Sequence, residues 1–377
     1  MPLQKFIFRP GIDREGTDYS NEGGWFDANL VRFRKNLPEK IGGWAKNTAN
    51  TFQSTGRAIH AWVDLSLTKF LGLGTTWKYY IQQGDAFNDI TPVRVTTGAN
   101  EISFAKVANG DATLNVTDTA HGAVENDFVT YSGCVSLGGL ITATVLNQEY
   151  QIATITSANV YTIEAKDTDG DEVLANSSDS GDGQGTIIGA YQINVGLDVY
   201  VESTGWGAGL WDAGTWGSVS ALSDTTNLRL WSHDNFGEDL IINARSGGIY
   251  YWDTSAKTLG TDRAVALSAL SGANLAPTKA LVTLVSDIDR HVVCFGADPI
   301  SGSSRTGSLD PMFIAWSDQE NAAEWEPKST NTAGSFRLSA GSSIIGAIRA
   351  RQETLVWTDT SMYSMTFVGQ PFTFATN

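Results

Sequence analysis

The four histidines of this 377-residue chain are the first side chains to consider for metal or acid–base chemistry. They are His60, His121, His233 and His291, and none lies three to five residues from another histidine or from a cysteine. Structural zinc sites commonly use such short spacings. We therefore expect all four to have structural roles, and we predict no metal site.

One acidic loop resembles a calcium-binding loop. Asp167, Asp169, Asp171 and Glu172 lie close together, and alternating carboxylates on a tight turn can converge on a hard cation. Gly170 comes too early for a helix–loop–helix calcium site, and no helical periodicity flanks the loop. The pattern favours a solvated turn, with a bound cation as the alternative, and no organic cofactor is predicted.

Glycoside hydrolysis requires two carboxylates about 5–10 Å apart across the sugar, and Asp234, Glu320 and Glu324 are candidates. Residues 232–237 resemble a turn motif of sialidase-like propellers, but the glycine is one place late and no Thr-Trp pair follows. We predict a turn in which Asp234 and Asn235 bond to their own backbone. Nucleophile-elbow and phosphate-loop motifs are absent, so we expect a protein without catalytic residues.

Arg32, Arg34 and Lys35 form the main basic cluster, with Lys40 nearby. Their alternation with apolar neighbours predicts a half-buried strand. A solvated strand face is one interpretation. A contact surface for an acidic neighbouring subunit or for DNA is the other.

Trp206, Trp211 and Trp216 recur every five residues among glycines, a spacing that fits neither a helix face nor a strand face. The pattern predicts a loop that brings three indoles together. These indoles either pack on the rim of a neighbouring sheet or form an interface with another subunit.

One sequence pattern occurs three times and predicts the architecture. Each copy is an apolar run, a short polar turn and an outgoing strand with tyrosine, which is typical of a β-hairpin. The copies are residues 71–81, 242–252 and 355–365. Each follows another apolar strand, at residues 57–63, 227–231 and 343–348, and a looser fourth copy runs through residues 280–285, 292–295 and 312–316.

These repeats predict an all-β fold, a β-propeller-like array in which each hairpin unit stacks on the next. Between residues 96 and 195 aromatics become rare and short alternating strands dominate, which predicts an inserted small β-sandwich. We expect three segments: an N-terminal strand and first blade (1–95), the insertion (96–195) and the remaining blades (196–377). No closing strand is visible near residue 377, so either the N-terminal strand closes the ring or the chain is part of a longer protein and the array is incomplete there.

The composition limits the possible functions. The net charge of −16 argues against a protein that coats nucleic acid, although an acidic wall can let DNA pass without adhesion. No apolar run is long enough to span a membrane, and no secretory signal is visible. Cys134 and Cys294 are expected to be buried thiols rather than a disulfide.

Several of these segments together resemble a known family. Residues 343–348, 353–359 and 367–374, with residues 37–44 near the N-terminus, are similar to the head-to-tail stabilisation proteins of bacteriophages, the tail accessory or nozzle-type components of short-tailed phages. The resemblance skips the insertion. It implies a propeller with inserted domains, whose subunits form a ring, usually sixfold, below the portal and adaptor.

From this resemblance we expect a structural virion protein, made in the host cytoplasm, that extends the DNA conduit and retains packaged DNA until ejection. The expected partners are further copies in a hexameric ring, portal or adaptor proteins, a tail spike or fibre, and double-stranded DNA that passes without sequence-specific binding. No membrane partner is expected. The alternative is a carbohydrate-binding or glycoside-hydrolysing β-propeller, because aromatic side chains also suit sugar stacking.

Overall fold

The computed structural model describes residues 9–17, 19–43, 45–199, 228–286, 289–370 and 372–377. Contacts within the chain divide it into two compact units, Met1–Asn50 and Thr51–Asn377. The boundary lies inside the expected first segment, 1–95. The described residues are almost entirely β: their helical elements are α1 (Ala143–Leu146) and the 3-10 turn η1 (Leu267–Ala269).

The N-terminal unit contains a hairpin of β1 (Val31–Arg34) and β2 (Leu37–Lys40), which pair antiparallel. Lys35 and Asn36 connect them and both have positive φ, as a two-residue hairpin turn requires. The ring of Phe33 lies 6.2 Å from that of Trp25, while the arginines of β1 are exposed. The predicted half-buried strand is confirmed.

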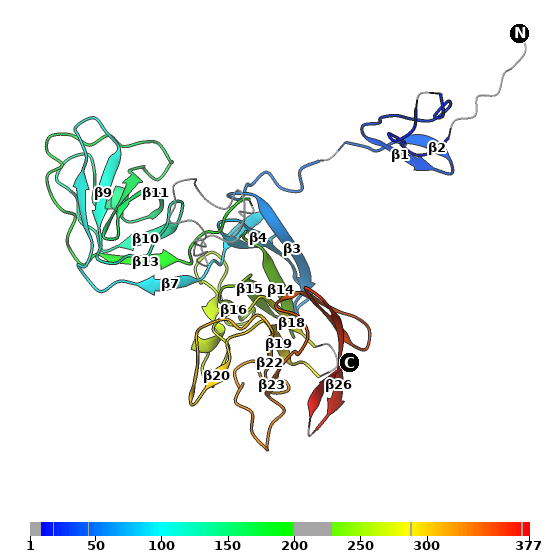
Figure 1. Ribbon diagram of the computed structural model, residues 1–377. Coiled ribbons are helices and arrows are strands. Elements are labelled where there is room, and N and C mark those ends of the chain that lie inside the picture. Colours follow the sequence, from blue (N-terminus) through cyan, green and yellow to red (C-terminus); the bar gives the residue numbers. More distant parts are fainter. Residues whose placement is uncertain (1–8, 18, 44, 200–227, 287–288, 371) are drawn as a thin grey trace, which may run out of the picture. The chain divides into compact units, whose positions relative to one another are not determined.

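The described residues of the second unit include four antiparallel sheets of four strands each, which we call blades 1 to 4 (Figure 1). Blade 1 contains β3 (Gly56–Val63), β4 (Lys69–Thr75), β5 (Tyr79–Gln83) and β6 (Ala86–Asp89). Blade 2 contains β14 (Trp231–Phe236), β15 (Asp239–Ala244), β16 (Ile249–Trp252) and β17 (Val265–Ala266). Blade 3 contains β18 (Val282–Val285), β19 (Val292–Phe295), β22 (Phe313–Trp316) and β23 (Gly334–Arg337). Blade 4 contains β24 (Ile344–Arg349), β25 (Thr354–Thr358), β26 (Met362–Gly369) and β27 (Thr373–Thr376).

The recurring hairpins of the sequence are confirmed. They are the pairs β4–β5, β15–β16 and β25–β26, and the looser fourth copy corresponds to β18, β19 and β22. In blade 3 a small separate hairpin, β20 (Ile300–Ser301) and β21 (Ser304–Arg305), is inserted between β19 and β22. The expected propeller-like array of sheets is therefore present.

One predicted boundary is wrong. The strand expected at residues 227–231 begins at Trp231, and the expected turn at residues 232–237 is β14, which pairs with β15 over its whole length. The turn comes at Gly237, whose φ is +72°. Packing between blades outweighs the turn preference of Asp234 and Asn235, because β14 lies between β3 and β18.

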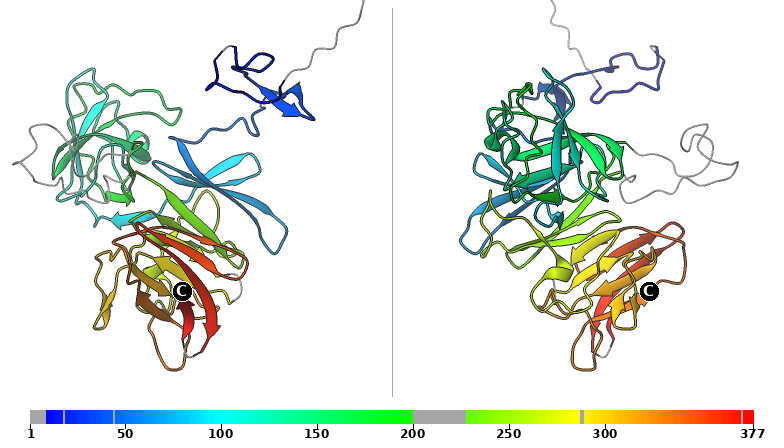
Figure 2. Two further views of the ribbon diagram at one scale, coloured as in Figure 1. Left: turned by 45° about the vertical axis from the view of Figure 1, so that its right-hand side comes forward. Right: turned by 90° about the vertical axis from the view of Figure 1, so that its left-hand side faces the viewer.

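The blades pack on one another in chain order (Figure 2). One hydrophobic cluster joins blades 1 and 2 around Trp231, a second joins blades 2 and 3 around Ile241, and a third joins blades 3 and 4 around Phe295. The first strands of consecutive blades contact each other. Blades 2 and 3 thus bury apolar side chains on both faces, as stacked repeats require.

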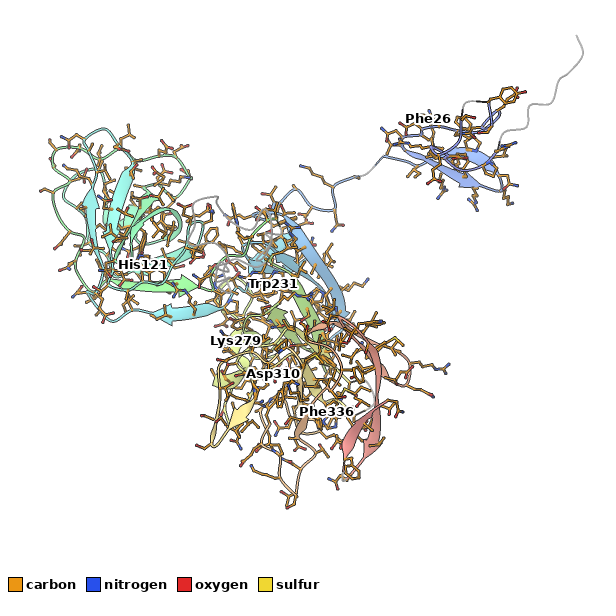
Figure 3. The ribbon with its side chains drawn as sticks, in the orientation of Figure 1. Phe26, His121, Trp231, Lys279, Asp310 and Phe336 are labelled. Atoms are coloured by element: carbon orange, nitrogen blue, oxygen red, sulfur yellow. The ribbon has the colours of Figure 1, made fainter. Side chains whose placement is uncertain are left out.

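A glycine allows a close approach between blades 1 and 2. A Cβ atom on Gly74 of β4 would lie only 2.4 Å from the indole of Trp231. The Nε1 atom of Trp231 donates a hydrogen bond of 2.7 Å to the carbonyl oxygen of Thr75 (Figure 3). The buried indole therefore has a polar partner, and its ring covers a backbone that carries no side chain there.

A seven-stranded sheet is inserted between blades 1 and 2. Its strands hydrogen-bond in the order β7, β13, β10, β11, β12, β9, β8. They are β7 (Val93–Thr96), β8 (Ser103–Lys106), β9 (Thr113–Thr117), β10 (Phe128–Ser132), β11 (Glu149–Ser157), β12 (Val160–Glu164) and β13 (Ile188–Gln192).

The two halves of this sheet surround one hydrophobic core, which contains Leu114 and Ile163 from one half and Val129 and Tyr191 from the other. They are continuous through β11, whose first residues pair with β10 and whose later residues pair with β12. The expected sandwich is thus a single sheet that folds over itself, and register shifts along β11 accompany the bend.

Both cysteines are free and buried, as predicted. Cys134 belongs to the core of the insertion and Cys294 to blade 3. Burial raises the pKa of the Cys134 thiol to about 11 and that of Cys294 to about 12. Both side chains therefore remain neutral and act as small apolar groups.

Candidate interface surfaces

The basic strand carries exposed cations, but their charge is partly compensated. Arg32 lies opposite Glu39 in the β1–β2 register, and its Nε atom is 3.1 Å from Glu39 Oε2. Arg34 and Lys35 are exposed, and neither forms an ion pair with the described residues. Trp206, Trp211 and Trp216 lie outside the described residues. An interface role for these residues stays a prediction.

Blade 1 has an apolar face that none of the other three described blades covers. On β3, His60 and Trp62 face blade 2, while Ile59 and Val63 point to the opposite side, where Ile59 is 67% exposed. A cavity of about 630 Å³ lies on this side, and Leu73 is among the residues that line it. Within the repeat, this outer face of blade 1 corresponds to the face of blade 2 that packs against blade 1.

Blade 4 has a corresponding face at the other end of the array. Val356 and Met365 are buried against blade 3. Trp357 and Met362 pair across β25 and β26 on the opposite face and are 37% and 58% exposed. Sequence reasoning missed both faces. The available signal was the apolar character of both sides of these strands, which suits a blade with two neighbours.

A buried network of charges joins the insertion to the array. Lys78, at the β4–β5 turn, is 3% exposed and forms ion pairs with Asp89 (3.0 Å) and with Glu149 of β11. Arg263 contacts the same two carboxylates, at 2.5 and 3.3 Å. Gln192 of β13 donates to both. Two cations thus balance two anions around the buried ammonium group of Lys78, and these contacts fix the insertion against blade 1.

The carboxylates considered for sugar chemistry take part in other contacts. Asp234 accepts hydrogen bonds of 2.9 Å from the backbone N–H of Val285 and from Arg349 Nη1, so it links blades 2, 3 and 4. Its other oxygen accepts from the backbone N–H of Asn235, and Asn235 Nδ2 donates to the carbonyl oxygen of Asp239 at 3.2 Å, so local backbone contacts of both residues are present although the segment is a strand. Glu320 pairs with Arg290 at 2.9 Å.

Glu324 and the acidic loop likewise have local partners. Glu324 pairs with Lys328 at 3.0 Å and accepts from Asn274. Asp167 accepts the backbone N–H groups of Asp169 and Asp171, both at 2.9 Å, so its carboxylate stabilises the turn. Among the described residues, no cluster of three or more His, Cys, Asp or Glu side chains could hold a metal ion.

Two histidines meet at the interface of blades 1 and 2. The rings of His60 and His233 are 4.8 Å apart. His60 Nε2 lies 2.5 Å from Asn235 Oδ1, and the Tyr79 hydroxyl lies 3.0 Å from His233 Nδ1. Burial, together with the neighbouring His60, lowers the pKa of His233 to about 4. His233 is therefore neutral at physiological pH.

Comparisons with known proteins leave the family open. No family model matches the sequence, and no curated protein matches it. Among solved structures, the chain is similar to the phage phi92 endosialidase, with 11% sequence identity and a TM-score of 0.23. The match covers 88% of this chain and 44% of that one, so the chain spans less than half of that protein's length. Within the described residues, no helix is sufficiently long and apolar to cross a membrane.

Proposed function

We propose that this chain is a structural subunit of a phage virion that assembles into a sixfold ring at the head-to-tail junction. There it extends the DNA conduit below the portal and retains packaged DNA until ejection. The proposed partners are further copies of the chain, portal or adaptor proteins and a tail spike or fibre. The sequence resemblance supplies the specific identity.

The exposed apolar faces of blades 1 and 4 are the observation that best supports an assembled state. Ile59 and Met362 are both more than half exposed, each on a sheet face that no other sheet of the described array covers. Monomeric proteins rarely leave contiguous apolar surfaces in water, and such surfaces mark sites of association. Assembly removes this surface from water.

The charges fit a conduit rather than a DNA-binding protein. The chain has 41 acidic and 25 basic residues, and double-stranded DNA that passes an acidic wall is repelled rather than held. We propose that Arg32, Arg34 and Lys35 contact an acidic neighbouring subunit, and that Trp206, Trp211 and Trp216 form part of a subunit seam.

The test is cryo-electron microscopy of the native particle, viewed along the tail axis, together with light scattering of the purified chain alone and mixed with its portal complex. A ring of sixfold symmetry around a channel wide enough for DNA is the expected result. If the chain stays monomeric both alone and with its portal complex, the ring proposal is wrong. Turnover of a polysaccharide that is lost on replacement of Asp234, Glu320 or Glu324 would instead favour a glycoside hydrolase.

A further inference from the structure

The N-terminal unit has an ordered backbone but no core. Hydrogen bonds tie its segments together: the backbone N–H of Asp13 donates to the carbonyl oxygen of Trp25 at 2.9 Å, and that of Ile41 donates to Leu30 at 2.7 Å. Yet none of the described residues between 9 and 50 is buried. Contact with any other surface can only reduce exposure, so the unit does not contain a core of its own.

A unit of this size needs another source of stability. Domains shorter than about 70 residues rarely bury enough apolar surface alone, and they depend on disulfides, metal ions or association. Residues 1–50 contain neither cysteine nor histidine, which excludes a disulfide and a typical zinc site. Association with another surface is the source that fits this sequence.

The unit exposes the apolar side chains that association would bury. These large apolar residues come from the loops as well as from the hairpin, and they are Ile12, Tyr19, Phe26, Leu30, Leu37 and Ile41 (Figure 3 labels Phe26). Tyr19 is 91% exposed and Leu37 is 68% exposed. Exposed apolar surface that is gathered on a small unit marks a site of association.

The charge of the unit indicates the kind of partner. Residues 1–50 have eight basic and six acidic side chains, a net charge of +2, which leaves residues 51–377 with 17 basic and 35 acidic side chains, a net charge of −18. Surfaces of opposite charge attract each other and align on encounter. The second unit of this same chain therefore has the charge that suits the first.

The tether favours a neighbouring copy over the same chain. Residues 45–51 contain no helix or strand, and at about 3.3 Å per residue they extend at most about 23 Å before Phe52 meets Phe87 of blade 1. The cavity on that side of blade 1 has one charged lining residue, Arg57, which pairs with Asp198 at 3.6 Å. The lining of this cavity therefore offers no carboxylate to a basic unit.

We propose that residues 9–50 are an arm that docks on residues 51–377 of a second copy and acquires its core there. This inference rests on the proposed assembly of copies and names the element that crosses between them. Exchange of an element between identical chains is a low-cost route to oligomers. Docking removes the apolar side chains of the arm from water and brings its cations to the acidic surface of the neighbour.

The test is chemical cross-linking of the whole chain in unlabelled and isotope-labelled forms, mixed as monomers at low concentration and then concentrated. A carbodiimide joins an amine directly to a carboxylate, so it reports contacts of Lys35, Lys40 and Lys46 with acidic residues. We expect cross-linked peptides that join these lysines to residues 51–377 and carry both isotopes. Their yield should fall as salt is added, because salt screens exposed charges.

Leu37→Ser should reduce the yield of these mixed-isotope peptides about tenfold or more, the loss expected when a large apolar side chain is removed from an interface. The matched control is Leu67→Ser, because Leu67 is 81% exposed but lies between β3 and β4 of blade 1. This control should cross-link normally. If circular dichroism shows that Leu37→Ser alters the fold, Tyr19→Ser replaces it, with the same expected loss.

Cross-links that carry one isotope only show docking within a chain and overturn the proposal. Cross-links that form only with the portal complex, when that is added, overturn it as well, and so does an equal loss in Leu67→Ser. Light scattering of the same mixture reports assembly separately. An assembled species without mixed-isotope cross-links refutes the arm and leaves the ring proposal intact, whereas a monomer in every mixture refutes both.

Discussion

The paired histidines at the junction of blades 1 and 2 give the fold a dependence on pH. His233 has a pKa of about 4 in the folded chain, against about 6.5 in an unfolded one. Below about pH 6.5 the histidine is therefore protonated in the unfolded state but not in the folded state. The free energy of unfolding falls as the pH is lowered from there to about pH 4. From this linkage we expect a loss of about 2 kcal/mol between pH 7.5 and pH 5.

Urea unfolding at both pH values measures this loss. His233→Gln keeps a polar group near Tyr79 and removes the titration, so the difference between it and the original chain isolates the histidine from other titrating groups. If the free energies of unfolding of the variant and the original chain differ by the same amount at both pH values, His233 does not cause the loss.

The buried charge network makes a second prediction at the level of residues. Lys78→Met leaves Asp89 and Glu149 with one cation in place of two, and Lys78 is 3% exposed. Removing one partner of a buried ion pair costs about 3–5 kcal/mol. We expect a loss of this order in the free energy of unfolding. Lys328→Met, at an exposed pair with Glu324, should change it by less than about 1 kcal/mol. Similar losses in the two variants would contradict this account.

Single residues were the hardest part to predict from the sequence. The buried thiols follow from composition and compartment. The role of Asp234 does not, because its partners Val285 and Arg349 are 51 and 115 residues away along the chain. Lys78 and Arg263 likewise look like ordinary surface cations until the insertion brings Glu149 to them.

At the scale of elements, the hairpins could be predicted because each contains its own turn and apolar strands. The start of β14 could not, since its residues favour a turn locally and become a strand through contacts with β3 and β18. The bend of the inserted sheet at β11 also depends on long-range pairing. Local patterns thus identified the units, and packing set their limits.

The approach of blades 1 and 2 gives a prediction at the same scale. Gly74→Ala places a methyl group about where the Trp231 indole lies, and overpacking of this kind costs about 1–3 kcal/mol. Gly346→Ala in β24 is the matched control, since no atom lies within 4 Å of its Cβ position. Thermal melting should show a lower midpoint for Gly74→Ala alone. Equal midpoints would mean that the blades separate to accept the methyl group.

At the scale of the whole molecule, the end faces of the array are expected to control association. Met362→Lys places a charge on the exposed face of blade 4 and leaves the core of blades 3 and 4 intact. We expect loss of the assembled species in light scattering with an unchanged melting temperature. Gln83→Lys, at an exposed position at the end of β5, is the control and should assemble normally. Assembly of Met362→Lys at the original concentration would exclude this face from the seam.

The insertion leaves and rejoins the array through neighbouring strands. β7 and β13 pair directly, with Val93 opposite Gln192, so the two crossing points of the chain are adjacent. A whole domain can be gained, lost or exchanged at such a place without rethreading the blades, as in natural domain insertions. Lys78 limits which exchanges succeed. A replacement domain without a carboxylate at the place of Glu149 would leave Lys78 and Arg263 with Asp89 alone, so we expect exchange to favour modules that carry one.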